Sequence, residues 1–289
     1  MTSEAAFISP VPVPRIDHIM VLLDGPAHEA ISQAAFLRER FARMKVKEAD
    51  SSLAGQYSTL GIAGESTLIE LFGPGNPSFG TLAGGLVFSF EEAGSAPAAR
   101  AALDAHAEVS YHHDLIRRTP PGTDTEQPWY QMISIALGAG SPLLLFLNAV
   151  TPEYFRGIGA RPGADGSLRR SAYLDATLGR ADRPFLMQDV TGVTLSVSPE
   201  RARRITDALT VFGYAVTECS GGWELCGHDL AIRLHVDELA AERITGIQLR
   251  LAPGSADSLP AREFRFGDTS RLVIEKDETA QWSFGCAGA

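Results

Sequence analysis

Residues 58–73, STLGIAGESTLIELFG, and residues 135–149, IALGAGSPLLLFLNA, are two versions of one pattern. They align when one residue is skipped after the shared Leu-Gly. Each stretch joins two apolar, strand-like runs through a turn that contains glycine. A pattern that returns within one chain indicates an internal duplication, and the flanking residues show how far the duplicated unit extends.

The first unit begins well before the quoted stretch. Residues 15–23 alternate like a strand, and residues 27–43 place apolar side chains at helical spacing. A further short strand is expected near residues 44–48, followed by strands at 56–63 and 66–72. The order is therefore one strand, one helix and then two or three strands.

The second unit repeats this order. We expect a strand at residues 85–90, a helix at 95–107, and strands at 109–118, 129–137 and 142–148. The duplication therefore extends over the whole N-terminal half.

Two more units follow in the C-terminal half. Their openings, TGVTLSVSPE at residues 191–200 and TGIQLRLAP at residues 245–253, are similar enough to be the same strand used twice. The third unit continues with an expected helix at 199–211 and strands near 214–218, 222–226 and 229–236. The fourth unit is shorter, because it lacks most of its helix before closing strands at 262–266 and 271–277.

The four units form two pairs. They predict an N-terminal domain at residues 1–150, a linker at 151–188 with a helix near 167–178, and a second domain at 189–289. The hydrophobic content of 45% is enough for a sizeable core in a chain of 289 residues.

The composition argues against several kinds of partner. The 35 acidic and 25 basic residues give a net charge of −10 without a basic cluster, so nucleic acid is not an expected partner.

No segment has the apolar length that a membrane span needs, and the start of the chain does not resemble a signal peptide, so we expect a cytoplasmic protein without membrane contact. The pattern G-x-x-x-x-G-K is missing, so no nucleotide cofactor is expected. Cys219, Cys226 and Cys286 fit neither a disulfide framework nor a cysteine zinc site.

Two residues of the first unit stand out chemically. His18 lies in IDHIMVLL and Glu70 lies in STLIELFGPG, each on an expected strand. Regular alternation gives His18 a face in common with Ile16 and Met20, and it places Glu70 beside Leu68. A carboxylate between apolar neighbours is costly to bury unless another group neutralises it.

The paired units and these two positions resemble the glyoxalase/bleomycin-resistance, or vicinal oxygen chelate, superfamily. The resemblance implies an α+β fold in which tandem βαβββ modules pair into two cupped, mixed β-sheet domains with helices on the outer face. In the metal-dependent members, a His on the first strand and a Glu on the last strand point into the cup, and His18 and Glu70 match those positions. The resemblance therefore implies that both are catalytic and that both bind one divalent metal ion, iron, manganese or zinc.

The other units do not carry this pair. At the position of His18, the repeat alignment has Gly85, Gly192 and Gly246. At the position of Glu70, it has Phe146, Arg233 and Glu275. Three interpretations stay open: a metal site completed by water and a further ligand, a metal-free pair in which His18 orients Glu70 as a base, or a structural hydrogen-bonded pair.

Four further residues are candidates for substrate binding. Tyr57, Trp129 and Tyr130 lie on strands that would line the first cup, where aromatic walls suit a small molecule, although aromatic residues also pack sheets on helices. In YHHDLIRR, alternation sends His112 and His113 to opposite faces, so at most one of them enters the cup. We rank His113 first, with an ordinary surface or core position as the alternative for each.

The sequence favours a small-molecule enzyme of the glyoxalase-like type, with lyase, isomerase or related chemistry on an oxygenated metabolite. The alternative is a non-catalytic protein that sequesters an antibiotic or metabolite in the cup, as resistance members of the superfamily do. The missing ligands of the second unit favour sequestration, whereas the buried carboxylate favours the enzyme. A scaffold of degenerate modules is a third interpretation. The second domain is expected to be structural or to form a homodimer.

Overall fold

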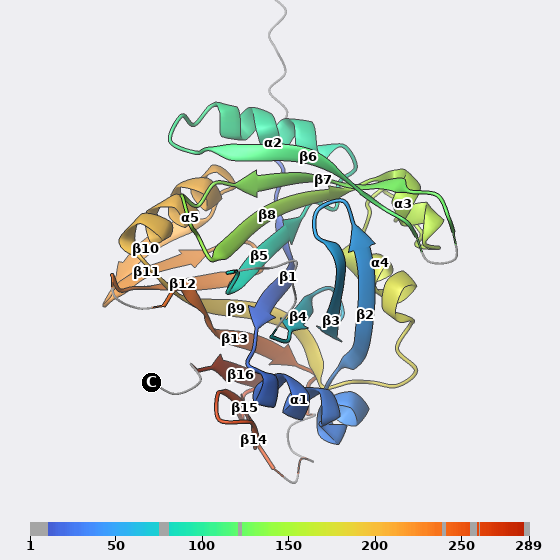
Figure 1. Ribbon diagram of the computed structural model, residues 1–289, viewed down its shortest axis with the longest axis vertical. Coiled ribbons are helices and arrows are strands. Elements are labelled where there is room, and N and C mark those ends of the chain that lie inside the picture. Colours follow the sequence, from blue (N-terminus) through green and yellow to red (C-terminus); the bar gives the residue numbers. More distant parts are fainter. Residues whose placement is uncertain are drawn as a thin grey trace, which may run out of the picture.

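The computed structural model describes residues 11–74, 81–120, 123–238, 241–254, 259 and 261–285. It has the expected α+β architecture, with the strands of the N-terminal half coloured blue to green in Figure 1 and those of the C-terminal half yellow to red. None of the helices in these ranges is long and apolar enough to cross a membrane. Cys219 and Cys226 are free thiols, and Cys286 lies outside the described residues.

The first sheet closes into a barrel, in the strand order β1-β4-β3-β2-β6-β7-β8-β5. The first module supplies β1 (Arg15–Leu22), β2 (Arg43–Ser51), β3 (Gly55–Ala63) and β4 (Leu68–Phe72). The second module supplies β5 (Gly84–Ser89), β6 (Tyr111–Arg118), β7 (Gln127–Ile135) and β8 (Leu143–Val150). β1 is parallel to β4 and β5 is parallel to β8, so both modules have the same internal pairing.

The two junctions between these modules differ. β1 and β5 pair along most of their length as an antiparallel ladder. On the opposite side, β2 and β6 share one register pair, Ser51 with Arg118, next to a hydrogen bond of 3.3 Å from the N–H of Ser52 to the carbonyl of Arg117. The barrel is therefore closed by a full ladder along one junction and only by the strand ends along the other.

The second sheet is open, in the order β10-β11-β12-β9-β13-β16-β15-β14. The third module supplies β9 (Met187–Val197), β10 (Ala215–Cys219), β11 (Gly222–Cys226) and β12 (Ala231–Val236). The fourth supplies β13 (Arg243–Leu251), β14 (Glu263–Phe266), β15 (Ser270–Ile274) and β16 (Thr279–Phe284). β9 and β13 join the two modules in an antiparallel ladder.

The fourth module corrects two sequence expectations. It has three closing strands, and the sequence analysis missed β16. A helical crossover is what returns a later strand parallel to the first. The described residues between β13 and β14 contain no helix, and β16 pairs antiparallel with β13. Glu275 follows β15 in the turn before β16, so it does not occupy the last-strand position that the alignment with Glu70 gave it.

Helices connect the strands of the other three modules. These crossovers are α1 (Gly25–Gln33), α2 (Ser95–Asp104) and α5 (Pro199–Val211). Asp24 caps α1 and Ser198 caps α5, because each side chain accepts a hydrogen bond from a backbone N–H of the first turn. The linker carries α3 (Pro152–Gly157) and α4 (Arg170–Leu178), of which the sequence predicted only α4.

The single helix expected at residues 27–43 is interrupted. α1 ends at Gln33, Ala34 is extended, and one π-helical turn follows at Leu37–Phe41. The interruption accompanies a stacking contact between Phe36 and Phe264 of β14, whose ring centroids are 3.9 Å apart. A contact with the second sheet thus replaces the continuation of the helix.

The first sheet has a different core on each face. Its outer face packs with the helices and the second sheet, so that Ile19 and Leu71 belong to one core with Ile247 of β13. Its inner face carries a separate apolar cluster that includes Met20 and Phe72. The inside of the barrel is therefore a distinct environment, separate from the core that the crossover helices cover.

The turn between β3 and β4 attaches the barrel to the second sheet. The N–H of Glu65 donates to the carbonyl of Gln188 at 2.5 Å, and the N–H of Ser66 donates to Oδ1 of Asp189 at 2.8 Å. Gly64 lies so close that a Cβ atom there would overlap the carbonyl oxygen of Gln188. This contact needs glycine because two backbones meet.

Gly64→Ala is expected to lower the free energy of unfolding by about 1–3 kcal/mol, because the added methyl group has to push two backbones apart. Urea denaturation followed by circular dichroism measures the change. Gly25→Ala is the matched control, since a Cβ atom there meets Pro74 at an ordinary 3.6 Å and the residue opens a helix. Equal stability of the two variants would contradict the proposed contact.

Candidate active site

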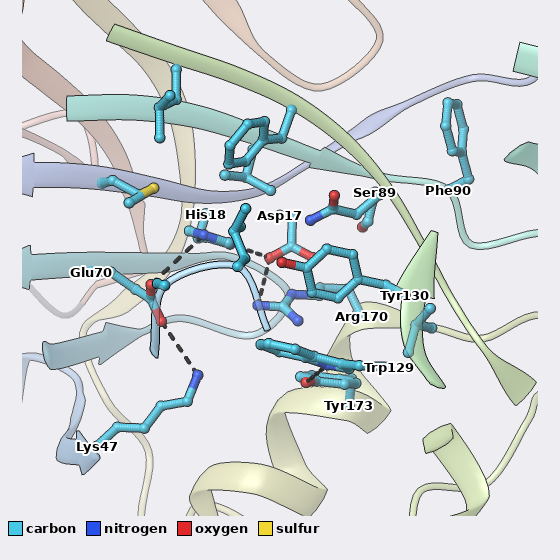
Figure 2. A pocket seen from close by; sticks show the side chains of 18 of the residues that line it. Asp17, His18, Lys47, Glu70, Ser89, Phe90, Trp129, Tyr130, Arg170 and Tyr173 are labelled. Atoms are coloured by element: carbon cyan, nitrogen blue, oxygen red, sulfur yellow. Dashed lines mark hydrogen bonds and ion pairs between the residues drawn. The ribbon is translucent and has the colours of Figure 1, made fainter. Parts of the chain in front are cut away.

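A cavity of about 250 Å³ lies within the barrel (Figure 2). It is smaller than the ~300–1,000 Å³ pockets that hold drug-sized ligands. Five residues selected from the sequence line it: His18, Tyr57, Glu70, Trp129 and Tyr130. The site therefore suits a small molecule.

The linker also contributes to this cavity. Leu168, Arg170 and Tyr173 belong to its wall. Figure 2 shows Arg170 and Tyr173 beside Trp129, at the end of the cavity away from Glu70. The segment expected to be a linker with a helix thus forms part of the site.

A β-bulge in β1 turns two consecutive side chains toward the cavity. Ile16 pairs with Phe88 and His18 pairs with Val87, so Asp17 is an extra residue on β1. Regular alternation would send Asp17 and His18 to opposite faces, but both line the cavity. The same shift places Ile16 in the outer core. The prediction that Ile16 and His18 share a face is therefore wrong, and Asp17 was missed for the same reason.

Two carboxylates flank the ring of His18. Oδ1 of Asp17 lies 2.6 Å from Nδ1, and Oε2 of Glu70 lies 3.7 Å from Nε2 (Figure 2). The short contact favours the tautomer that carries its proton on Nδ1 and donates it to Asp17. In that tautomer, the lone pair of Nε2 faces Glu70.

Two basic residues neutralise these carboxylates. Nζ of Lys47 lies 3.4 Å from Oε1 of Glu70, and Nη2 of Arg170 lies 2.6 Å from Oδ1 of Asp17. The sequence analysis assigned a role to neither residue. Lys47 lies on a strand with several other charged residues and Arg170 lies in the linker, so no local pattern separates them from ordinary surface residues.

These contacts set the charges of the site. Burial raises the pKa of Glu70, but Lys47 and His18 outweigh it, so the pKa lies below its ordinary 4.5. Burial raises the pKa of Asp17 too, and Arg170 with His18 brings it below its ordinary 3.8. For Lys47, burial lowers the pKa more than Glu70 raises it. Both carboxylates are therefore ionised at neutral pH, and the Lys47 ammonium is more acidic than usual.

Aromatic side chains form the opposite wall. Nε1 of Trp129 donates a hydrogen bond of 2.9 Å to the hydroxyl of Tyr173, and the rings of Trp129 and Tyr130 meet edge to face at 4.5 Å. Burial raises the pKa of Tyr57, Tyr130 and Tyr173. The phenols therefore remain neutral hydrogen-bond donors.

The structure does not bring His113 to the cavity. Ile116 of the same strand belongs to the cluster inside the barrel, and His113, three residues earlier, has the opposite parity. Nε2 of His113 lies 3.4 Å from Oε1 of Gln131. His112 has the parity of Ile116, but it is exposed and does not line the cavity either.

The donor atoms do not fit the divalent metal that the resemblance implied. His18 and Glu70 converge, but the described part of the chain places no group of three or more His, Cys, Asp or Glu side chains for a metal ion. Oδ1 of Asp17 is already in contact with His18 and Arg170. The ammonium of Lys47 lies where it would repel a second cation. Lys47 supplies the neutralisation of Glu70 that was expected from a metal.

A family model described as a family of unknown function, DUF5829, matches residues 16–284. No curated protein matches the chain. Similar solved structures include a hypothetical protein from Staphylococcus aureus, with 12% identity, a TM-score of 0.49, and 80% of this chain and 88% of that chain covered. A 2,2',3-trihydroxybiphenyl 1,2-dioxygenase from Sphingomonas wittichii has 11% identity and a TM-score of 0.48, with 93% of this chain and 89% of that chain covered. A homoprotocatechuate 2,3-dioxygenase from Arthrobacter globiformis has 12% identity and a TM-score of 0.43, with 94% of this chain and 80% of that chain covered. Likeness at this level does not establish a reaction for this chain.

Glu70→Gln is expected to lower stability at pH 7 by about 1–3 kcal/mol, because it leaves Lys47 without its carboxylate partner. The loss should shrink in acid. A carboxylate with a lowered pKa contributes its full stability above its ordinary value of 4.5, and that contribution disappears as the pH falls through the folded-state pKa.

Urea unfolding of both proteins between pH 7 and pH 2.5 measures this dependence. Glu48→Gln, which changes an exposed carboxylate on the same strand as Lys47, should leave stability unchanged at every pH. A difference between wild type and Glu70→Gln that stays constant down to pH 2.5 would disprove the assigned charge.

Proposed function

Since the chain belongs to the family of unknown function DUF5829, its function has to be inferred from its site, and we propose a glyoxalase-like enzyme that moves a proton on a small oxygenated molecule without a metal. The observation that carries this proposal is that the ring of His18 lies between two carboxylates on the cavity wall, with Nδ1 next to Asp17 and Nε2 next to Glu70. An isomerase or lyase that acts next to a carbonyl group needs such a step, because its reaction begins by removing a proton from the neighbouring carbon.

His18 is the base in this proposal. Nδ1–H is held by Asp17, so Nε2 is free to take a proton, and the imidazolium that forms lies between two carboxylates. Glu70 is less suited to this role than the sequence analysis supposed, because its lowered pKa makes it a weak base. Glu70 instead stabilises the protonated ring and positions Lys47.

The geometry leaves room for a reacting atom. Nε2 of His18 and Oε2 of Glu70 are 3.7 Å apart, so one substrate atom can lie about 3 Å from both. Lys47 adjoins the same carboxylate. Its ammonium can therefore stabilise the negative charge that develops on a substrate oxygen when the neighbouring proton leaves.

The surrounding wall supports this chemistry. Phe72 and Phe146 line the same cavity, and Tyr130 covers its other side. A small space with mostly apolar walls has a lower local dielectric constant than bulk water, which strengthens the interactions of Lys47 and Glu70 with a bound substrate.

Deuterium exchange tests the proton transfer without assuming the final product. The protein is incubated in D₂O with small oxo acids and hydroxy ketones, and loss of the proton next to the carbonyl is followed by NMR. We expect exchange with at least one of these compounds, and we expect His18→Ala to slow it by at least about 100-fold, the usual contribution of a general base. His113→Ala, a histidine outside the cavity, is the matched control and should exchange like wild type.

Binding of a compound without exchange would contradict the enzyme and favour sequestration instead. Exchange that His18→Ala leaves unchanged would contradict the assignment of the base. His18→Ala and His113→Ala are compared at equal folded fraction by circular dichroism.

Removal of divalent metals should leave the exchange rate unchanged within about twofold, because Lys47 and not a metal neutralises Glu70 in this proposal. The measurement compares protein before and after dialysis against EDTA, with elemental analysis of both samples. A rate that falls with the metal content and returns with added iron, manganese or zinc would overturn the metal-free mechanism.

A further inference from the structure

Two buried polar atoms of the cavity wall have no hydrogen-bond partner among the residues that the structure describes. They are Nε of Arg170 and Oδ1 of Asn148. Asn148 is only 8% exposed. Buried donors and acceptors are nearly always paired, so each of these atoms indicates a place for an atom that comes from outside the chain. One of them is a charged donor and the other is an acceptor.

The charges of the site favour an anion. Lys47 contacts Glu70 and Arg170 contacts Asp17, so each of these two carboxylates already has its own cation. Arg118 lies against Trp129 of the cavity wall as a third cation. These three side chains carry three positive charges, against two negative charges on Asp17 and Glu70. One positive charge is left for a ligand to neutralise.

Arg118 is the source of this surplus. It is buried, and its guanidinium carbon lies 4.7 Å from the centre of the Trp129 ring. It also hydrogen-bonds to Tyr154. An aromatic face and a phenol stabilise the guanidinium without cancelling its charge. Glu91 accepts a hydrogen bond from the backbone N–H of Arg170, and its own charge is paired with Arg15.

The wall beside Arg170 suits a flat molecule. Trp129, Tyr130 and Tyr173 come together at this end of the cavity (Figure 2). Ser89 and Asn148 are register partners on β5 and β8, and both line the cavity. A ring that lies against the aromatic side chains can therefore reach a charged donor and a polar pair of side chains.

We propose that the cavity takes a small planar monoanion: a carboxylate on an aromatic or unsaturated body that also carries a hydroxyl or N–H donor. Nε–H of Arg170 donates a hydrogen bond to the carboxylate of the ligand, while Nη2 of the same side chain contacts Asp17. Oδ1 of Asn148 accepts a hydrogen bond from the hydroxyl or N–H group of the ligand. The inference rests on the proposed function only in using the same cavity, because binding does not require proton transfer.

The first test compares ligands of one shape and different charge. Ligand-observed NMR titrations use 3-hydroxybenzoate, its neutral amide 3-hydroxybenzamide and the cation 3-hydroxybenzylamine. We expect the acid to bind at least about tenfold more tightly than the amide, as one charge-assisted hydrogen bond provides, and we expect no binding of the cation. Equal affinity for acid and amide, or binding of none of the three, overturns the proposal.

The second test assigns the contacts. Arg170→Lys keeps a charge beside Asp17 but removes Nε, so it should lower the affinity for 3-hydroxybenzoate about tenfold. Arg169→Met removes the neighbouring exposed cation and should change the affinity by less than twofold. Wild type should bind 3-hydroxybenzoate more tightly than benzoate, and Asn148→Ala should bind the two with equal affinity. Unchanged affinity in Arg170→Lys overturns the assigned carboxylate contact, and a retained hydroxyl advantage in Asn148→Ala overturns the assigned donor contact.

The two proposals fail separately. Glu70→Gln should slow deuterium exchange, because the protonated ring of His18 loses one carboxylate, but it should still prefer the acid to the amide, because Arg170 and Asn148 are unchanged. Anion binding without exchange in the wild-type protein would contradict only the enzyme. Exchange on neutral compounds without preference for the acid would contradict only the ligand class.

Discussion

The site depends on one extra residue in β1. Without the bulge, Asp17 would point into the apolar core between the two sheets, where an unpaired carboxylate is strongly destabilising. With the bulge, Asp17 meets His18 and Arg170 inside the barrel. A local irregularity of the strand thus decides which tautomer His18 adopts and where the linker is attached.

The linker in turn is held in place by the barrel that it covers. Nη1 of Arg43 contacts Oδ1 of Asp175 at 2.6 Å, and Leu174 packs on Leu68. These contacts fix α4, so Arg170 reaches Asp17 from a defined direction. The second sheet, for which we propose no site of its own, anchors the far end of the linker through β9 and so contributes to the cavity indirectly.

The sequence was informative where a signal repeats and uninformative where a signal depends on a distant contact. The duplicated strands predicted the modules, and the polar residues His18 and Glu70 were recognisable because they interrupt apolar strands. Asp17 could not be placed, since strict alternation assigns it to the wrong face and a bulge has no marker in RIDHIMVL. Arg170 could not be found either, because its partner is about 150 residues away in the sequence.

The junction between β2 and β6 gives the barrel a weak line. Strands elsewhere in the ring are held by ladders of several pairs. β2 and β6 are joined by the register pair of Ser51 with Arg118 and by two hydrogen bonds between Ser52 and Arg117. Lys47 lies on β2 as well, four residues before Ser51. Opening this line breaks few backbone hydrogen bonds, which makes it the least costly place for the ring to widen around a bound molecule. The barrel can therefore widen along this one line while the other strand ladders of the ring stay intact.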